Sequence, residues 1–108
     1  MKESTYHEFT ELPAWTQAIW SDSTVVNQDD PYKWGGTNPP PAIGARVHVY
    51  MNGIGPGTVT SYFAEHGWLG VLVRPHKAPK WYVKQNGRYK PGHVFGPELE
   101  PRTVKQEA

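Results

Sequence analysis

The stretch 44–73 constrains the fold more than any other part of the chain, because it carries the pattern of consecutive β-strands. Val47, Val49 and Met51 alternate with polar or aromatic residues at the positions between them. Neighbouring side chains of a strand point to opposite faces, so this alternation is typical of a half-buried strand. The first strand of a β-domain is therefore expected here.

The residues after this strand predict a chain reversal and two more strands. Residues 52–57 read Asn-Gly-Ile-Gly-Pro-Gly, in which the glycines tolerate positive φ and the proline fixes one turn position. Two segments, 58–63 and 68–73, are rich in the β-branched and aromatic residues that favour strands. Together the three strands predict an antiparallel meander.

The part of the chain that follows predicts a tight hairpin. Asn86-Gly87 lies between 81–85 and 88–90, and this dipeptide suits a turn with two positive φ angles. Three later elements are expected: a short strand at 93–95, a helical turn at 96–99 and a last pairing segment near 102–104. The prediction for residues 44–108 is a mainly β, five-stranded barrel.

Residues 1–43 differ in character and are predicted to form an amino-terminal arm. Pro13 suits the first turn of a helix, and Leu12, Trp15 and Ile19 would share one helical face. The arm is therefore expected to contain a short helix. It also holds three of the five tryptophans, which a disordered tail would lack, so the arm is expected to dock partly on the barrel.

Charge is distributed unevenly along the chain. Residues 1–43 have a net charge of −4 and residues 44–108 have a net charge of +5, within a total of +1. Residues 66–97 contain no acidic side chain but six lysines and arginines, interleaved with aromatic residues. Basic side chains among rings are typical of surfaces that bind phosphates and stack bases, and also of peptide grooves.

The candidate binding face consists of eight residues. They are Tyr62, Trp68, Lys80, Trp81, Tyr82, Lys84, Arg88 and Tyr89. The favoured partner is a protein or peptide, held in an aromatic groove or by a ring cage around a cation. A nucleic acid is the alternative partner, and a third interpretation is that most of these rings simply form the core.

The sequence offers no catalytic or cofactor motif, so a non-enzymatic role is favoured and no cofactor is expected. There is no cysteine, and the five histidines show no zinc-ligand spacing. If the protein were an enzyme, His93 would be the first residue to test. No charged-then-apolar leader or long apolar run is recognisable, which favours a cytoplasmic protein without membrane contact. The oligomeric state stays open.

Glycine and valine positions resemble the rhythm of Src-homology-3-like barrels, including the CAP-Gly, KOW and Tudor types. The resemblance covers residues 44–104 and is carried by Gly44-Ala45-Arg46-Val47, Gly57-Thr58-Val59 and Gly70-Val71-Leu72-Val73. It implies a small bent barrel and leaves the function open, because these residues serve bending and packing.

The chain is also similar to the plasmid-borne type II dihydrofolate reductases, at Gly44, Arg46, Val47, Gly57, Tyr62 and Gly70. That family lines a four-subunit pore with glutamine, isoleucine and tyrosine, where this chain has His93, Val94 and Phe95. The resemblance implies an oligomeric pore enzyme as a further alternative. In style, a tryptophan-rich arm and a proline-rich lead, the chain also resembles uncharacterised proteins of bacterial prophages.

Overall fold

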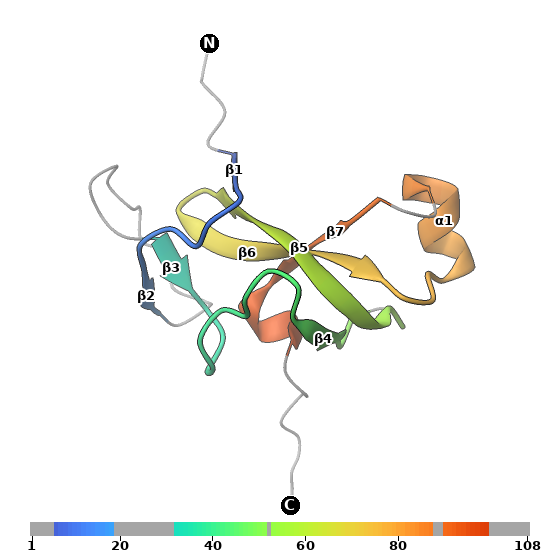
Figure 1. The fold of residues 1–108 in the computed structure, drawn as a ribbon, viewed down its shortest axis with the longest axis horizontal. Helices are drawn as coiled ribbons and strands as arrows, with labels where there is room; N and C mark the ends of the chain where they lie inside the picture. Colours follow the sequence, from blue (N-terminus) through green and yellow to red (C-terminus); the bar gives the residue numbers. More distant parts are fainter. Residues whose placement is uncertain (1–5, 19–31, 52, 88–89, 100–108) are drawn as a thin grey trace, which may run out of the picture.

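A computed structural model describes residues 6–18, 32–51, 53–87 and 90–99 of the 108-residue chain. In this part of the chain the fold is mainly β, as predicted, with one α-helix and one 3₁₀ turn (Figure 1). The elements are β1 His7–Phe9, β2 Trp15–Gln17, β3 Tyr32–Trp34, β4 Arg46–Val49, β5 Gly55–Glu65, β6 Trp68–Pro75, α1 Lys80–Asn86, β7 Gly92–Phe95 and η1 Gly96–Leu99.

The long β5–β6 hairpin forms the centre of the molecule (Figure 1). His66 and Gly67 connect the strands with φ angles of 54° and 83°, the two positive values that a tight hairpin turn needs. A register shift between Val59 and Ser61 adds a bulge, which increases local bending and twist. The three strands predicted within residues 44–73 are confirmed, although β5 already begins at Gly55.

Each strand of this hairpin pairs with two different strands along its outer edge. β4 and β1 pair with opposite ends of β5, while β7 and β3 pair with β6, and β2 extends the sheet from β3. The β2–β3 and β3–β6 pairs are parallel and the others antiparallel. Among the described residues, the result is an open mixed sheet of seven strands instead of the predicted closed five-stranded barrel.

The described parts of residues 1–43 add strands and core side chains to the sheet. Trp34 is almost completely buried, and Phe9, Trp15 and Tyr32 pack against the same hydrophobic cluster. These rings join the inward-facing valines of β4, β5 and β6. A domain of this size has little core of its own, so these additional rings strengthen it.

The short helix predicted within residues 12–20 is wrong for the described part of that segment, which forms β2. The Tyr32 amide donates a hydrogen bond to the Ala14 carbonyl, and the Ala18 amide donates one to the Trp34 carbonyl, each at a distance of 3.1 Å. A helix this short would form few internal hydrogen bonds, whereas a strand beside β3 satisfies its backbone through tertiary pairing. Leu12 is 43 % exposed, so it does not share a buried face with Trp15.

The predicted hairpin around Asn86-Gly87 is also wrong, because Lys80–Asn86 forms helix α1. Pro79 precedes the helix in an extended conformation, and its carbonyl accepts a hydrogen bond from the Val83 amide. Gly87 ends the helix with a φ of 88°, and its amide donates to the Val83 carbonyl. The glycine of the Asn-Gly pair does take a positive φ, but it does so as a helix terminator.

The last described elements agree with the prediction. β7 contains the expected strand at 93–95, and η1 is the expected helical turn. The Glu98 side chain accepts a hydrogen bond from the Phe95 amide at 2.8 Å, which caps the turn. The backbone of η1 reaches β4, since the Tyr50 amide donates to the Glu98 carbonyl at 2.7 Å. The pairing segment predicted near 102–104 lies outside the described residues.

Candidate functional site

A cavity of about 260 Å³ lies between α1 and the sheet. Its apolar lining includes Met51, Ile54, Val73 and Val94, which come from the β4–β5 connection, β6 and β7. Trp81 from α1 also lines it and is 39 % exposed. We call this cavity the α1 pocket. Its residues come from four separate segments, so it exists only when α1 is docked on the sheet.

Tyr82 attaches α1 to the rest of the protein. The side chain is 2 % exposed, and its hydroxyl donates a hydrogen bond to the Lys90 carbonyl. Burial raises the pKa of this phenol because the charged form loses its solvation. A Cβ on Gly92 would approach the Tyr82 hydroxyl oxygen to 2.9 Å, so glycine gives the ring its space. The packing of Tyr82 against Gly92 holds α1 in the position from which Trp81 lines the α1 pocket.

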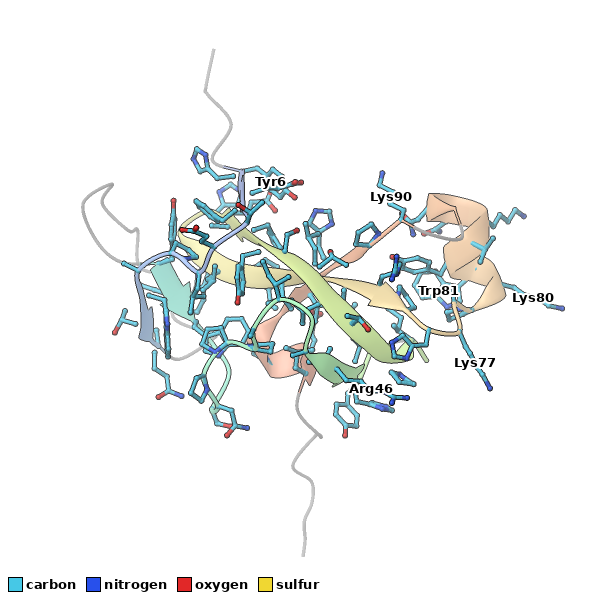
Figure 2. All side chains as sticks on the ribbon, in the orientation of Figure 1. Tyr6, Arg46, Lys77, Lys80, Trp81 and Lys90 are labelled. Carbon is cyan, nitrogen blue, oxygen red and sulfur yellow. The ribbon has the colours of Figure 1, made fainter. Side chains whose placement is uncertain are left out.

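Lysines lie at the α1 pocket and beside it. Lys90 lines the pocket together with His93, whereas Lys77 and Lys80 lie outside its lining, at the end of the molecule that carries α1 and Trp81 (Figure 2). Lys84 is also exposed on this helix. None of the described residues that line the pocket is acidic. An apolar recess with lysines beside it suits an apolar group that is accompanied by negative charge.

The eight residues of the sequence-predicted face do not all meet at this place. The structure brings Lys80, Trp81, Tyr82 and Lys84 together on α1, with the rings of Trp81 and Tyr82 5.6 Å apart in an edge-on arrangement. Tyr82 is buried, so the ring exposed on this helix is Trp81. Arg88 and Tyr89 lie outside the described residues.

The other two predicted residues occupy different surroundings. Tyr62 is 3 % exposed within the core, and its hydroxyl donates to the Pro41 carbonyl at 2.8 Å. Trp68 begins β6 at the end opposite to α1, where the Lys33 ammonium lies 5.7 Å from the ring centroid. The core interpretation of the rings therefore applies to Tyr62 and Tyr82.

Sequence reasoning missed the apolar lining of the α1 pocket and the part that His93 plays in lining it. Met51, Ile54 and Pro91 carry no chemical signature of their own, and only the folded chain brings them together. One signal was available: Pro79 and Gly87 bracket a segment of helical length, which is a typical pair of helix boundaries. Taking Pro79 and Gly87 as helix boundaries would have placed Trp81 and Tyr82 at adjacent positions of one short helix.

His93 takes part in a hydrogen-bonded chain with the first described strand. The Tyr6 hydroxyl donates to a Glu8 carboxylate oxygen at 2.7 Å, and it also lies 2.7 Å from His93 Nε2. These two contacts link Glu8, Tyr6 and His93 in one chain. Burial and the neighbouring Glu8 raise the pKa of Tyr6, so the phenol stays protonated and the chain intact.

Two further features were sought in the described residues, a metal-binding cluster and a membrane-spanning helix. In this part of the chain, no group of three or more histidine and carboxylate side chains is arranged to hold a metal ion. None of its helices has both the length and the apolar character that crossing a membrane requires. Comparison with models of protein families, with curated proteins and with solved structures finds no match to this chain.

Proposed function

We propose that this chain is a non-enzymatic binding module whose α1 pocket receives an apolar side chain from an acidic segment of a partner protein. The observation that carries the proposal is an apolar recess walled by Trp81, with Lys90 in its lining and further lysines exposed on the adjacent helix α1. Residues 66–97, which supply β6, α1 and β7, contain no acidic side chain. A recess of this kind on the surface of a small domain is typical of a binding site.

The recess and the lysines beside it would contribute differently to the free energy of binding. Burying one large apolar side chain contributes about 1.5–3 kcal/mol, whereas each exposed ion pair contributes about 0.2–1 kcal/mol. The apolar anchor would therefore supply most of the affinity. The lysines would accelerate association and select acidic partners over basic ones. A cage around a cationic side chain is disfavoured, because these lysines would repel it.

Selection from a library of random peptides tests this function. The expected peptides carry one bulky apolar residue among acidic residues. Trp81→Ala should weaken the binding of a selected peptide at least tenfold, and Lys80→Glu should weaken it less. Arg46→Ala, which removes a cation away from α1, serves as the matched control and should bind as the unaltered protein does. Selected peptides that are basic, or that bind Trp81→Ala normally, would contradict the proposal.

Salt separates the peptide function from its nucleic-acid alternative at the same pocket. Exposed ion pairs around an apolar anchor predict a modest loss of affinity as salt rises. Contact with several phosphates predicts a steep linear decline of log affinity with log salt. If a single-stranded oligonucleotide displaces the peptide and its binding depends on Trp81, the α1 pocket is a nucleic-acid site.

We also propose that the fold closes as a Src-homology-3-like barrel at the edge of β4 that faces away from β5. Support comes from the hydrogen bond between the Tyr50 amide and the Glu98 carbonyl, which brings η1 to the end of β4. β4 has a pairing partner only on its β5 side among the described strands. Nuclear Overhauser contacts between the β4 backbone and a further strand at this edge would be expected, and their absence in the folded protein would refute closure.

A further inference from the structure

A second cation-bearing surface lies on the outer face of β4, β5 and β6, away from the α1 pocket. Arg46 is paired in register with Thr58, and Thr58 is paired with Arg74. Directly paired residues of neighbouring strands point to the same face, so the three side chains form one row across the sheet. Both arginines are exposed, whereas Val73, the neighbour of Arg74, is buried on the inner face and lines the α1 pocket.

A second row runs parallel to the first. His48 is paired with Pro56, and the His76 amide donates to the Pro56 carbonyl at 3.0 Å, which places His76 on the other side of Pro56. His48 and His76 are exposed. The Thr58 hydroxyl lies 2.8 Å from His76 Nε2, so a hydrogen bond ties the two rows together. Strand pairing thus fixes two arginines and two histidines in a grid.

An aromatic platform borders this grid. Tyr50, which is 41 % exposed, follows His48 two positions later, and the two rings lie 4.4 Å apart. Among the described residues, neither Arg46 nor Arg74 forms an ion pair with a carboxylate. We call the grid and the platform, Arg46, His48, Tyr50, Thr58, Arg74 and His76, the outer β face. Figure 2 shows Arg46 on β4, in the lower part of the view.

We propose that the outer β face binds single-stranded nucleic acid. Two strand spacings separate Arg46 from Arg74, about 10 Å, so the two guanidinium groups would hold separate positions along one phosphate backbone. Guanidinium groups pair with phosphate oxygens through two hydrogen bonds, and an exposed ring beside them offers a surface on which a base stacks. A duplex, whose bases are already stacked on one another, would not use the rings of His48 and Tyr50.

The proposal is tested with the full chain and labelled oligodeoxyuridylate or oligouridylate of about 12 nucleotides, by fluorescence anisotropy over a salt series. Replacing Arg46 and Arg74 together by alanine should weaken binding at least tenfold. It should also lower the salt slope by about 1.4, because each phosphate contact on a single strand contributes about 0.7. Tyr50→Ala should weaken binding about fivefold, and Tyr50→Phe should restore it. Oligodeoxyuridylate and oligouridylate share one base, so the difference between their affinities reports which sugar is preferred.

Matched variants keep this test independent of net charge and of folding. Replacing Lys80 and Lys84 by alanine removes the same charge from α1 and should leave affinity within about twofold. The double arginine-to-lysine variant keeps the charge and should bind more tightly than the double alanine variant. Melting curves confirm that each variant is folded at the assay temperature.

Several results would overturn the proposal. They are equal losses in the two double alanine variants, a duplex that binds as tightly as the single strand, no binding at low salt, and a selected acidic peptide that requires Arg46 and Arg74. The peptide result would reassign the outer β face to protein binding. Failure to bind a single strand, or equal binding of a duplex, leaves the α1 pocket proposal standing, because that function depends on Trp81. A selected peptide that requires Arg46 would also contradict the α1 pocket proposal, in which Arg46→Ala binds normally.

Discussion

The α1 pocket and the outer β face lie on opposite sides of the same end of the β5–β6 hairpin, and they hold their cations in different ways. The pocket surrounds an apolar recess with lysines carried by a seven-residue helix and the segments beside it. The outer β face holds arginines and histidines on three hydrogen-bonded strands. One surface is concave and depends on how a helix docks, whereas the other is a sheet face set by register.

The difference teaches that two surfaces with charge of the same sign can suit different kinds of partner. Flexible lysines around a recess attract and orient an anionic chain, while the apolar anchor fixes its position. Arginines at a fixed strand spacing recognise regularly placed phosphates, and neighbouring rings recognise bases. The following variants disturb the two surfaces together or separately, beginning with the largest expected effect.

Tyr82→Ala should destabilise the protein most, by about 3–5 kcal/mol, because it removes a buried ring that joins α1 to the core. The α1 pocket would lose its wall. Chemical denaturation measures the loss of stability, and peptide binding measures the loss of the pocket. If the variant stays as stable as the unaltered protein, α1 does not contribute to the core, and the pocket as described does not exist.

Gly57→Ala should destabilise the protein by about 1–3 kcal/mol and disturb both surfaces at once. The added Cβ would lie 2.6 Å from Val73 Cγ1, beside the α1 pocket, and 2.8 Å from the Arg74 carbonyl, on the strand of the outer β face. Gly87→Ala is the comparison. A Cβ added at Gly87 would have no neighbouring atom within 4 Å, so the only strain would come from the positive φ at the end of α1. It should weaken peptide binding alone.

Alkaline pH should lower stability through two buried phenols, Tyr62 in the core and Tyr82 on α1. Burial raises the pKa of both Tyr62 and Tyr82 above the ordinary value of 10.0. Above pH 10 the unfolded chain releases these protons first, so the free energy of unfolding falls as pH rises towards the higher pKa of the folded state. Below pH 10 this contribution is fully present.

Phenylalanine variants separate the two phenols. Tyr82→Phe and Tyr62→Phe should each cost about 1 kcal/mol at pH 7, through the lost hydrogen bond. Each should also flatten the decline above pH 10, as measured by denaturant titration at several pH values. An unchanged slope in either variant would show that the phenol in question does not titrate differently in the folded and unfolded protein.

Lys84→Ala should have the smallest effect on stability, within about 0.5 kcal/mol, because the side chain is exposed on α1. It should nevertheless reduce the salt dependence of peptide binding at the α1 pocket. Binding of the oligonucleotide to the outer β face should stay the same. A clear loss of oligonucleotide binding would show that the two surfaces act as one.

Local signals predicted the centre of the fold and its last described elements well, but they gave the wrong structure for residues 15–17 and 80–86. The alternation around Val47 and Val49 and the glycines of the turns were sufficient for β4, β5 and β6, because strand faces and turn geometry depend on nearby residues. Asn86-Gly87 was ambiguous, since glycine with positive φ ends helices as well as hairpin strands. For the candidate site, the sequence revealed the stretch rich in cations and rings. It did not reveal the apolar residues that line the α1 pocket.

The sequence by itself determined a mainly β protein with an uneven charge distribution, because residue alternation, turn residues and net charge are properties of the chain. Tertiary structure decided that residues 15–17 form a strand, that residues 80–86 form a helix and that Tyr62 is buried, because each outcome depends on a distant partner. It also decided that Arg46 and Arg74 share a row, since register is set by strand pairing and lies beyond what adjacent residues specify.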